Sequence, residues 1–394
     1  MKRLDILLYA HDGRGVGHAS RVAALGLALV RRHPAMRVAM LTGERRVASL
    51  LRGLPLEWIK MPSYATSVRD GRSSGAAGDC GLSDADLGEA RAELIASCVR
   101  IFRPRVFVAD HTPQGKHREL LPAIEERGDT RFVLGVRAVV GGVDKVWSDL
   151  AASVFASAYS GILWYGDAAL CGDEAARLFT HFGREPVACG YVSRLLELAA
   201  AGRVAQGMRE GVVVGLSWRD AGFLDLLQAV TETANEFPGL SPWRVFCDLS
   251  GNGQDGEADA LRSQVLDVVR ACPHLRLEEF GEGYGDALMS ARAAVVYGGY
   301  NSLTDILAAG LPAVVLLRGM RDQEQEDHAR RLAGVRPGIT LLPADGLGAA
   351  DLADALRGVM AHDVPIKSPV PLDGAARAAD VLAEMARAAR EMEK

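Results

Sequence analysis

Short apolar runs alternate with helical patterns along the whole 394-residue chain. Near-continuous apolar strands that are separated by helices are typical of parallel sheets covered on both faces. The sequence therefore predicts an α/β fold with doubly wound sheets, in which ligands bind at the carboxyl ends of the strands. The expected strands are residues 5–10, 37–41, 105–109, 131–136, 161–165, 211–215, 243–247, 275–279, 293–297 and 313–317, and the expected helices include 19–32, 223–236 and 257–271.

The length of the chain indicates more than one domain. A chain of 394 residues is too long for one ordinary core and suits two α/β domains. The strand pattern restarts at Gly211, after a polar, Ala-rich stretch at 197–210. We expect a first domain over 1–195 and a second over 205–372, with a C-terminal helix, 373–394, that packs back on the first.

Composition limits the partners and cofactors. Hydrophobic residues make up 49% of the chain and charged residues 24%, as in soluble globular proteins, and the net charge of −5 argues against nucleic acid. The six cysteines form no CxxC pair and no carboxylate cluster requires a metal, so no metal or other cofactor is expected. No opening segment resembles a signal peptide and no run is long enough to cross a bilayer, which predicts a cytoplasmic protein. Residues 45–54 mix arginines with apolar residues, a pattern of a solvated helix face or of a patch that touches a membrane surface.

The stretch from residue 293 to residue 312 carries the strongest functional signal. A predicted strand runs into two glycines, a helix opens directly after them, and Asp305 lies in its first turns. A helix N-terminus beside glycines attracts phosphate, and an acidic side chain accepts hydrogen bonds from ribose hydroxyls. The alternative is an acidic residue that only complements the helix dipole. The predicted diphosphate-binding residues are Gly298, Gly299, Tyr300, Asn301 and Ser302.

Other turns of the second half follow predicted strands and add candidate donor contacts. Ser217 is expected to contact phosphate and Arg219 to act as a cationic clamp, unless Arg219 is an ordinary surface residue. Glu324 and Gln325 stand near a helix start, where they read sugar hydroxyls or form a polar helix face. The remaining candidates, at the ends of two further strands, are Ser250, Phe280 and Gly281, the last two beside a nucleotide base.

A glycine-rich loop follows the first strand and ends in a histidine. Gly13, Gly15 and Gly17 allow a close approach of the backbone to a ligand, and the helix start that follows attracts negative charge. The loop also fits a dinucleotide site, although no acidic ribose partner is evident. His18 is expected to act as a general base or to contact the sugar or phosphate; the alternative is a loop histidine bonded to a backbone carbonyl.

Two further features of the first half bear on the acceptor. Asp110 ends a predicted strand and is a candidate to accept a proton or orient a histidine, or else to cap the following helix. Residues 62–88 have little periodicity and predict a long loop that serves as a lid or is disordered.

Taken together, these motifs resemble the donor site of GT-B glycosyltransferases, and most of all the MurG-like group, whose best-known member transfers N-acetylglucosamine onto the lipid precursor of peptidoglycan. The loop that ends in His18 resembles the N-terminal motif of that group, and the turns at Ser217 and Ser250 resemble two of its donor-site turns. Within the group the chain is most similar to uncharacterised predicted glycosyltransferases. The segments that carry this similarity are 9–12, 108–113, 134–137 (ending in Arg137), 164–167 and 190–192.

Three positions depart from the pattern of that group. The ribose-binding residue, usually Glu, is Asp305, and the pair of glutamines that reads the sugar becomes Glu324 and Gln325. Leu216 stands at the centre of a turn that is otherwise Gly-Gly-Ser. The identity of the donor sugar is therefore open.

The resemblance implies a GT-B fold, with two doubly wound, Rossmann-like domains that face each other across a cleft. It implies a nucleotide diphosphate sugar, of the UDP type, on the second domain and an unknown acceptor on the first, near the glycine loop and Arg137. Transfer would invert the anomeric centre without a metal, with His18 as the first choice of base and Asp110 as the second. A nucleotide-sugar hydrolase of the same fold and an inactive nucleotide-sugar-binding regulator or scaffold are the alternatives.

Overall fold

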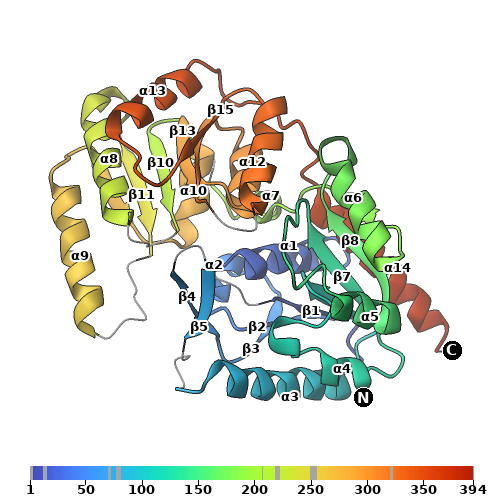
Figure 1. Cartoon of the computed structure of the whole chain (residues 1–394). Coiled ribbons are helices and arrows are strands. Elements are labelled where there is room, and N and C mark those ends of the chain that lie inside the picture. The colour runs from blue at the N-terminus through green and yellow to red at the C-terminus, as the bar shows by residue number, and fades with distance from the viewer. Residues whose placement is uncertain are drawn as a thin grey trace. The chain divides into compact units, whose positions relative to one another are not determined.

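The computed structural model divides the chain into two compact units, residues 1–201 with 370–394 (unit 1) and residues 202–369 (unit 2). It describes the backbone of residues 3–11, 16–69, 72–76, 81–205, 207–217, 222–248, 255–319 and 323–393, and the side chains of the same residues except 65–69, 72–76 and 255–259. Each unit is an α/β layer structure built on a parallel sheet (Figure 1).

Unit 1 contains a seven-stranded sheet in the order β3-β2-β1-β6-β7-β8-β9, in which all paired strands run parallel. The chain winds outward from β1 in one direction and from β6 in the other, so the switch point of the topology lies between these two strands. The strands span Ile6–Tyr9 (β1), Val38–Thr42 (β2), Glu57–Lys60 (β3), Val106–Asp110 (β6), Arg131–Arg137 (β7), Tyr159–Tyr165 (β8) and Val187–Ala188 (β9).

Helices of unit 1 connect these strands, and their ends follow local signals in the sequence. For example, the Ser83 hydroxyl accepts a hydrogen bond from the Asp86 amide at the start of α3, and Arg103 ends that helix in a left-handed conformation. The helices are α1 (Gly17–Arg32), α2 (Val47–Leu51), α3 (Asp84–Phe102), α4 (Leu121–Glu125), α5 (Asp149–Ala158), α6 (Ala168–Phe182), α7 (Arg194–Ala200) and α14 (Gly374–Glu391), with one 3-10 turn, Lys116–Arg118.

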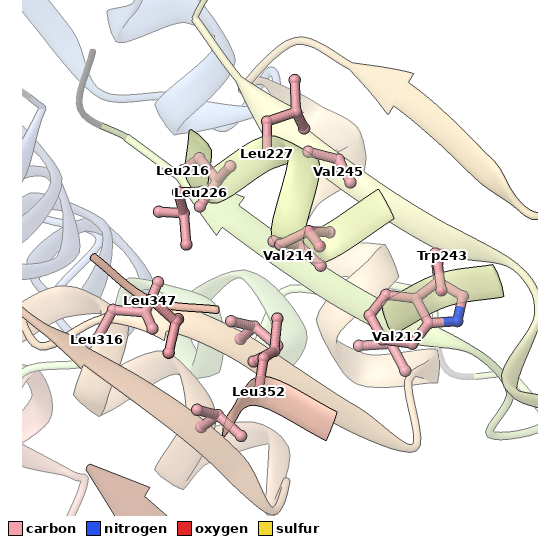
Figure 2. Close-up of a cluster of buried hydrophobic side chains, with 14 of the residues drawn as sticks. Val212, Val214, Leu216, Leu226, Leu227, Trp243, Val245, Leu316, Leu347 and Leu352 are labelled. Atoms are coloured by element: carbon pink, nitrogen blue, oxygen red, sulfur yellow. The ribbon is translucent and has the colours of Figure 1, made fainter. Parts of the chain in front are cut away.

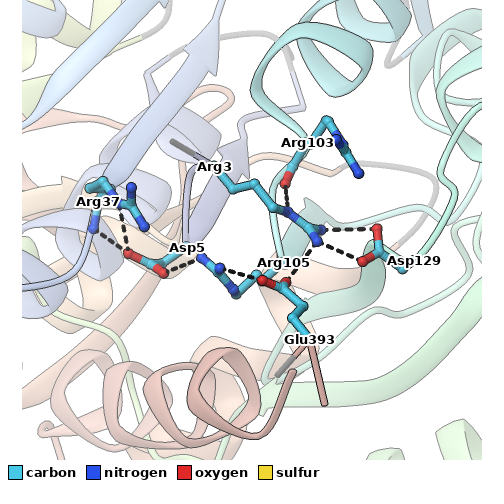
Figure 3. Close-up of polar contacts among 7 residues, drawn as sticks. All are labelled: Arg3, Asp5, Arg37, Arg103, Arg105, Asp129 and Glu393. Atoms are coloured by element: carbon cyan, nitrogen blue, oxygen red, sulfur yellow. Dashed lines mark hydrogen bonds and ion pairs between the residues drawn. The ribbon is translucent and has the colours of Figure 1, made fainter. Parts of the chain in front are cut away.

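The C-terminal helix α14 packs against α1 and ties the end of the chain to its beginning. Asp380 of α14 pairs with Arg32 at 2.5 Å and with His33 at 2.9 Å. Beyond the helix, Glu393 accepts hydrogen bonds from Arg3 at 2.7 Å and Arg105 at 2.6 Å, as Figure 3 shows. These contacts close unit 1 with residues from both ends of the sequence.

Unit 2 contains a six-stranded parallel sheet in the order β12-β11-β10-β13-β14-β15. Its core joins β10 and β11 to α8 and α13, with Val214, Trp243, Leu227 and Leu352 among the buried side chains (Figure 2). The elements are β10 (Val212–Leu216), α8 (Phe223–Glu236), β11 (Trp243–Cys247), α9 (Asp255–Arg270), β12 (Leu275–Glu278), α10 (Glu282–Ser290), β13 (Ala293–Tyr297), α11 (Tyr300–Ala309), β14 (Ala313–Leu317), α12 (Glu324–Val335), β15 (Ile339–Pro343) and α13 (Ala349–Met360), with one 3-10 turn, Pro238–Leu240.

The doubly wound α/β architecture predicted from the sequence is confirmed, and each strand predicted there is present. The prediction of one long loop over 62–88 is wrong. That segment contains an antiparallel hairpin of β4 (Ala65–Arg69) and β5 (Arg72–Ala76), and α3 begins within it, at Asp84. The hairpin was missed because its residues are mostly small or polar and give no alternation of apolar residues.

The mixed segment 45–54 has three of its apolar side chains in the core. Val47, Leu50 and Leu51 are buried and offer no apolar surface to a membrane, whereas Leu54 is partly buried. Among the described residues, no helix is both long enough and apolar enough to span a bilayer.

A buried ion pair joins α3 to the residue that follows the 3-10 turn Lys116–Arg118. Arg91 and Glu119 are both fully buried and meet at 2.6 Å, Nε to Oε2. Tyr64, just before the hairpin, donates a hydrogen bond of 2.6 Å to the same oxygen, and the Tyr9 hydroxyl donates to Oε1. Removing the cation would leave a carboxylate buried without its counter-charge.

We therefore expect Arg91→Met to destabilise unit 1 by about 3–5 kcal/mol. Arg100→Met is the matched control, because Arg100 lies on the same helix but is half exposed, and its pair with Glu126 should contribute about 0–1 kcal/mol. Hydrogen exchange of peptides from β1, followed along a urea titration, measures the free energy of unfolding of unit 1 separately from that of unit 2. Equal effects of the two substitutions would contradict this role of the pair.

Candidate functional site

The carboxyl ends of β1 and β6 bring together the functional residues of unit 1. These two strands are hydrogen-bonded neighbours, with Tyr9 beside Ala109. His11 follows β1, Asp110 is the last residue of β6, and His111 comes directly after it. His18 lies in the first turn of α1, the helix that follows β1. Sequence positions 92 residues apart therefore meet at the switch point of the sheet.

Asp110 binds both His18 and Arg21. Its Oδ2 lies 2.5 Å from Nδ1 of His18. Arg21 donates to Oδ1 from Nε at 3.0 Å and from Nη2 at 2.7 Å. Arg21 lies three residues after His18, on the same face of α1, which lets both side chains reach one carboxylate. Asp110 thus orients the imidazole, and Arg21 fixes the carboxylate.

Burial and charge set the protonation of this cluster. Burial, the largest influence, raises the pKa of Asp110, but the charges of Arg21 and His18 and their hydrogen bonds outweigh it and lower the pKa to about 2. Burial is also the largest influence on His18, and it lowers the pKa of the imidazole below its ordinary value although Asp110 acts in the opposite direction. At neutral pH the carboxylate is therefore ionised and His18 is neutral.

One nitrogen of His18 remains open to a ligand. Nδ1 donates to Oδ2 of Asp110, and Nη2 of Arg21 lies 3.1 Å from that same nitrogen, whereas Nε2 makes no hydrogen bond with any residue that the structure describes. The side chain is 16% exposed, against 2% for Asp110. An imidazole that donates from Nδ1 to a carboxylate presents Nε2 as a proton acceptor, which is the arrangement of a general base.

Two further histidines, for which the sequence predicts no role, complete the cluster. The ring of His18 lies 5.0 Å from that of His11 and 5.3 Å from that of His111, centroid to centroid. Burial lowers the pKa of both additional rings well below the ordinary value. Their positions just beyond the carboxyl ends of β1 and β6 are the signal in the sequence, because the carboxyl ends of adjacent strands lie at the same edge of the sheet.

The remaining residues predicted near this loop divide into two groups. Gly17 is the first residue of α1, and Arg137 ends β7, the neighbour of β6, where its charge lowers the pKa of His111. Gly13 and Gly15 lie outside the described residues. Val16, which precedes α1, provides no side-chain cap, and the first turn of the helix contains no acidic residue.

In unit 2 the predicted strand–glycine–helix element is present. β13 runs through Gly298 and Gly299 into α11, which starts without a side-chain cap and without an acidic residue in its first turn. A Cβ atom at Gly298 would lie 3.3 Å from Val315, whereas one at Gly299 would meet no atom of the described residues within 4 Å. The structure therefore leaves space beside Gly299, at the positive end of α11.

The other residues of this element differ in exposure. Asn301, Ser302 and Asp305 are partly buried, and Asp305 lies in the second turn of α11. Tyr300 is buried and stacks on His328 of α12, with 5.8 Å between ring centroids. His328 is not among the residues predicted for the site. It could have been predicted from its place in the same helical segment as Glu324 and Gln325.

The remaining donor-site candidates follow other strands of the same sheet. Ser217 is exposed directly after β10, and Gly281 precedes α10. Phe280 is partly buried and packs against Tyr284, with ring centroids 5.0 Å apart. Glu324 is buried and Gln325 partly buried at the start of α12. Arg219 and Ser250 lie outside the described residues.

Two other features of the structure do not mark the site. A cavity of about 580 Å³ is lined by Leu4, Val38, Glu57 and Phe102, which lie at the amino ends of the strands or at the end of α3, away from the functional edge of unit 1. Within the described part of the chain, no group of three or more His, Cys, Asp or Glu side chains is arranged to hold a metal ion.

Comparison with known proteins gives a fold. No model of a known protein family matches the chain, and no curated protein matches its sequence. Solved structures do match over nearly the whole length. A Listeria monocytogenes protein named as a UDP-N-acetylglucosamine 2-epimerase aligns with a TM-score of 0.65 at 11% identity, covering 96% of this chain and 94% of that one. Acinetobacter baumannii MurG aligns with a TM-score of 0.50 at 13% identity, over 99% and 95% of the chains.

A third match is the spinosyn forosaminyltransferase SpnP, with a TM-score of 0.54 at 13% identity over 98% and 95% of the chains. The chain has the GT-B fold. The resemblance drawn from the sequence motifs is thus confirmed in the architecture of the two parallel-sheet units.

The geometry around Asp110 predicts the response of its histidine partner. Asp110→Asn removes a negative charge that favours the imidazolium and leaves Arg21 unopposed, so the pKa of His18 should fall further. Histidine-selective NMR along a pH titration measures it. Asp129→Asn, in the same unit but paired with Arg3, is the control and should leave His18 unchanged. A raised pKa of His18 in Asp110→Asn would show that the pairing is misassigned.

Proposed function

We propose that the protein is a glycosyltransferase that moves a sugar from a nucleotide diphosphate sugar, of the UDP type, to a hydroxyl group of an acceptor. The observation that carries this proposal is the dyad of His18 and Asp110, in which a neutral, oriented imidazole keeps Nε2 open to a ligand. A sugar hydroxyl needs such a base to lose its proton as it attacks the anomeric carbon.

The two members of the dyad take different roles. Asp110 is a poor base, because its pKa is about 2 and both of its oxygens receive hydrogen bonds from Arg21 or His18. His18 accepts the proton at Nε2, and the resulting imidazolium is stabilised by the carboxylate at Nδ1. Attack from the face opposite the leaving group inverts the anomeric centre.

The donor binds to unit 2 in this proposal. The start of α11, with the space beside Gly299 and no acidic residue in its first turn, suits the diphosphate. Asp305, one turn further along the helix, accepts hydrogen bonds from the ribose hydroxyls. The helix dipole stabilises the leaving diphosphate without a metal, together with Arg219. The nucleotide base of the donor lies near Phe280 and Gly281. Glu324 and Gln325 form hydrogen bonds with the hydroxyl groups of the sugar.

The names of the structural neighbours are compatible with this chemistry. One is a forosaminyltransferase and another is named for UDP-N-acetylglucosamine. The second name also favours a second candidate function, in which the same base acts on a nucleotide-sugar without a sugar acceptor, as in hydrolysis, where it activates water. A protein that binds the nucleotide-sugar and does not turn it over is the remaining alternative.

Product analysis separates these functions. The protein is incubated with UDP-, GDP-, dTDP- and CMP-sugars, with and without a panel of hydroxyl acceptors, and the products are identified by mass spectrometry. Acceptor-dependent release of the nucleotide together with a glycosylated product supports the transferase. Rapid release of free or epimerised sugar without an acceptor supports the second function, and binding without turnover supports the regulator.

Asp305→Ala should weaken binding of the nucleotide-sugar by about 1.5–3 kcal/mol, as expected for the loss of charge-assisted hydrogen bonds. Isothermal titration calorimetry measures the effect. Asp351→Ala is the matched control, because Asp351 is exposed on α13 of the same unit. Unchanged donor affinity in Asp305→Ala would remove the ribose assignment.

His18→Ala should lower kcat by about 10²–10⁴-fold if His18 is the base. In the parent protein, kcat/KM should fall as the pH drops through the pKa of His18, which lies below the ordinary value of 6.5. His362→Ala is the control, since His362 is exposed in unit 2. Near-normal turnover of His18→Ala would exclude His18 as the base.

A further inference from the structure

Two buried ring nitrogens in unit 1 have no hydrogen-bond partner among the residues that the structure describes. Nδ1 of His11 and Nδ1 of His111 are shielded from solvent and make no hydrogen bond among the described residues, and the two residues are only 8% and 6% exposed. Their rings lie 5.6 Å apart, at the ends of adjacent strands. A buried polar group without a partner costs about 1–3 kcal/mol, so a pair of them indicates that a polar ligand completes the site.

The charges around these rings are mostly positive. His11 experiences the permanent charges of Lys116 and Lys145, which disfavour its protonation, and of Asp110, which favours it. His111 experiences the permanent charges of Arg137 and Arg21, which disfavour its protonation. Asp110 is the one carboxylate among these groups, and it is already bound by Arg21 and His18. The positive end of α1 adds to the field. The missing ligand group is therefore an anion.

Phosphate fits these donors better than a carboxylate does. It has three strong acceptor oxygens and carries a charge between about −1.5 and −2 at pH 7. Two protonated imidazoles and the amides of a helix start can donate to it at the same time. A neutral imidazole can donate from one nitrogen only, so binding favours the imidazolium form of His11 and His111.

We propose that His11 and His111 bind a phosphate group of the acceptor and take up protons when it binds. The inference rests on the proposed function only in naming the ligand as the acceptor; the phosphate-binding site itself does not depend on that function. The histidines are neutral in the free protein because burial and the nearby cations lower their pKa, and a bound dianion reverses that electrostatic effect. The acceptor of this protein would thus be a phosphate monoester, such as a phosphorylated sugar.

Calorimetry on the full chain, saturated with UDP, tests the proposal with inorganic phosphate and pyrophosphate as probes. Titrations at pH 7 in buffers with different ionisation enthalpies give the number of protons exchanged. We expect net proton uptake and an affinity that falls at least tenfold from pH 6 to pH 8. Absence of binding, or binding without proton uptake, would overturn the proposal. Competition between phosphate and UDP would also overturn it, because the anion would then occupy the donor site.

Asparagine variants separate the titration from the fold. His11→Asn and His111→Asn keep a polar group near the position of Nδ1 but cannot be protonated, and Asn tolerates the left-handed backbone of His111, where φ is 76°. Each should weaken phosphate binding at pH 6 by about tenfold and reduce the proton uptake, with thermal unfolding as the check on folding. His362→Asn, exposed in unit 2, is the control and should change neither quantity. Normal uptake in both variants would contradict the assignment.

The outcomes also distinguish this inference from the proposed function. Asp305→Ala should leave phosphate binding intact, because Asp305 lies in unit 2. Phosphate binding with proton uptake in a protein that shows no sugar transfer would keep the site and reject the transferase. Transfer to neutral acceptors only, without phosphate binding, would keep the transferase and reject the site.

Discussion

The buried carboxylate of Asp110 is the interaction on which the functional half of unit 1 depends. An ionised carboxyl group that is 2% exposed is stable only because Arg21 binds it through two nitrogens and His18 binds it at 2.5 Å. The same contacts join α1 to β6 and set the orientation of the imidazole. The carboxylate of Asp110 therefore has a structural and a chemical role. It positions α1, and it determines which nitrogen of His18 faces a ligand.

The two units share an architecture but carry different chemical groups at their candidate sites. Unit 2 presents a helix start beside Gly299 whose N-cap residue provides no side-chain cap, which suits a phosphate that is held by backbone amides and the helix dipole. Unit 1 places three histidines and one ion pair at the switch point of its sheet, which suits proton transfer and the recognition of charge. A parallel sheet can form either kind of site, because residues from separate strands lie close together at its carboxyl edge.

Much of the architecture could be predicted from the sequence. Strands such as 105–109 and 293–297 are near-continuous apolar runs, and such runs are stable only between two layers of helices. The hairpin of β4 and β5 could not be predicted, because its small and polar residues carry no periodic signal. The apolar residues of segment 45–54 could not be assigned to a surface or a core, since a five-residue helix is too short for its buried face to be read from periodicity.

The sequence by itself determined the fold class and the glycine–helix element at Gly298 and Gly299, because both depend on local patterns of neighbouring residues. It also singled out His18 and Asp110, yet it left open which of them is the base. Only the tertiary structure decided how they are joined: Arg21 and Asp110 are 89 positions apart, and His11 and His111 are 100 apart. Protonation states follow from burial and from charges in contact, and these arise only when the strands are side by side in the sheet.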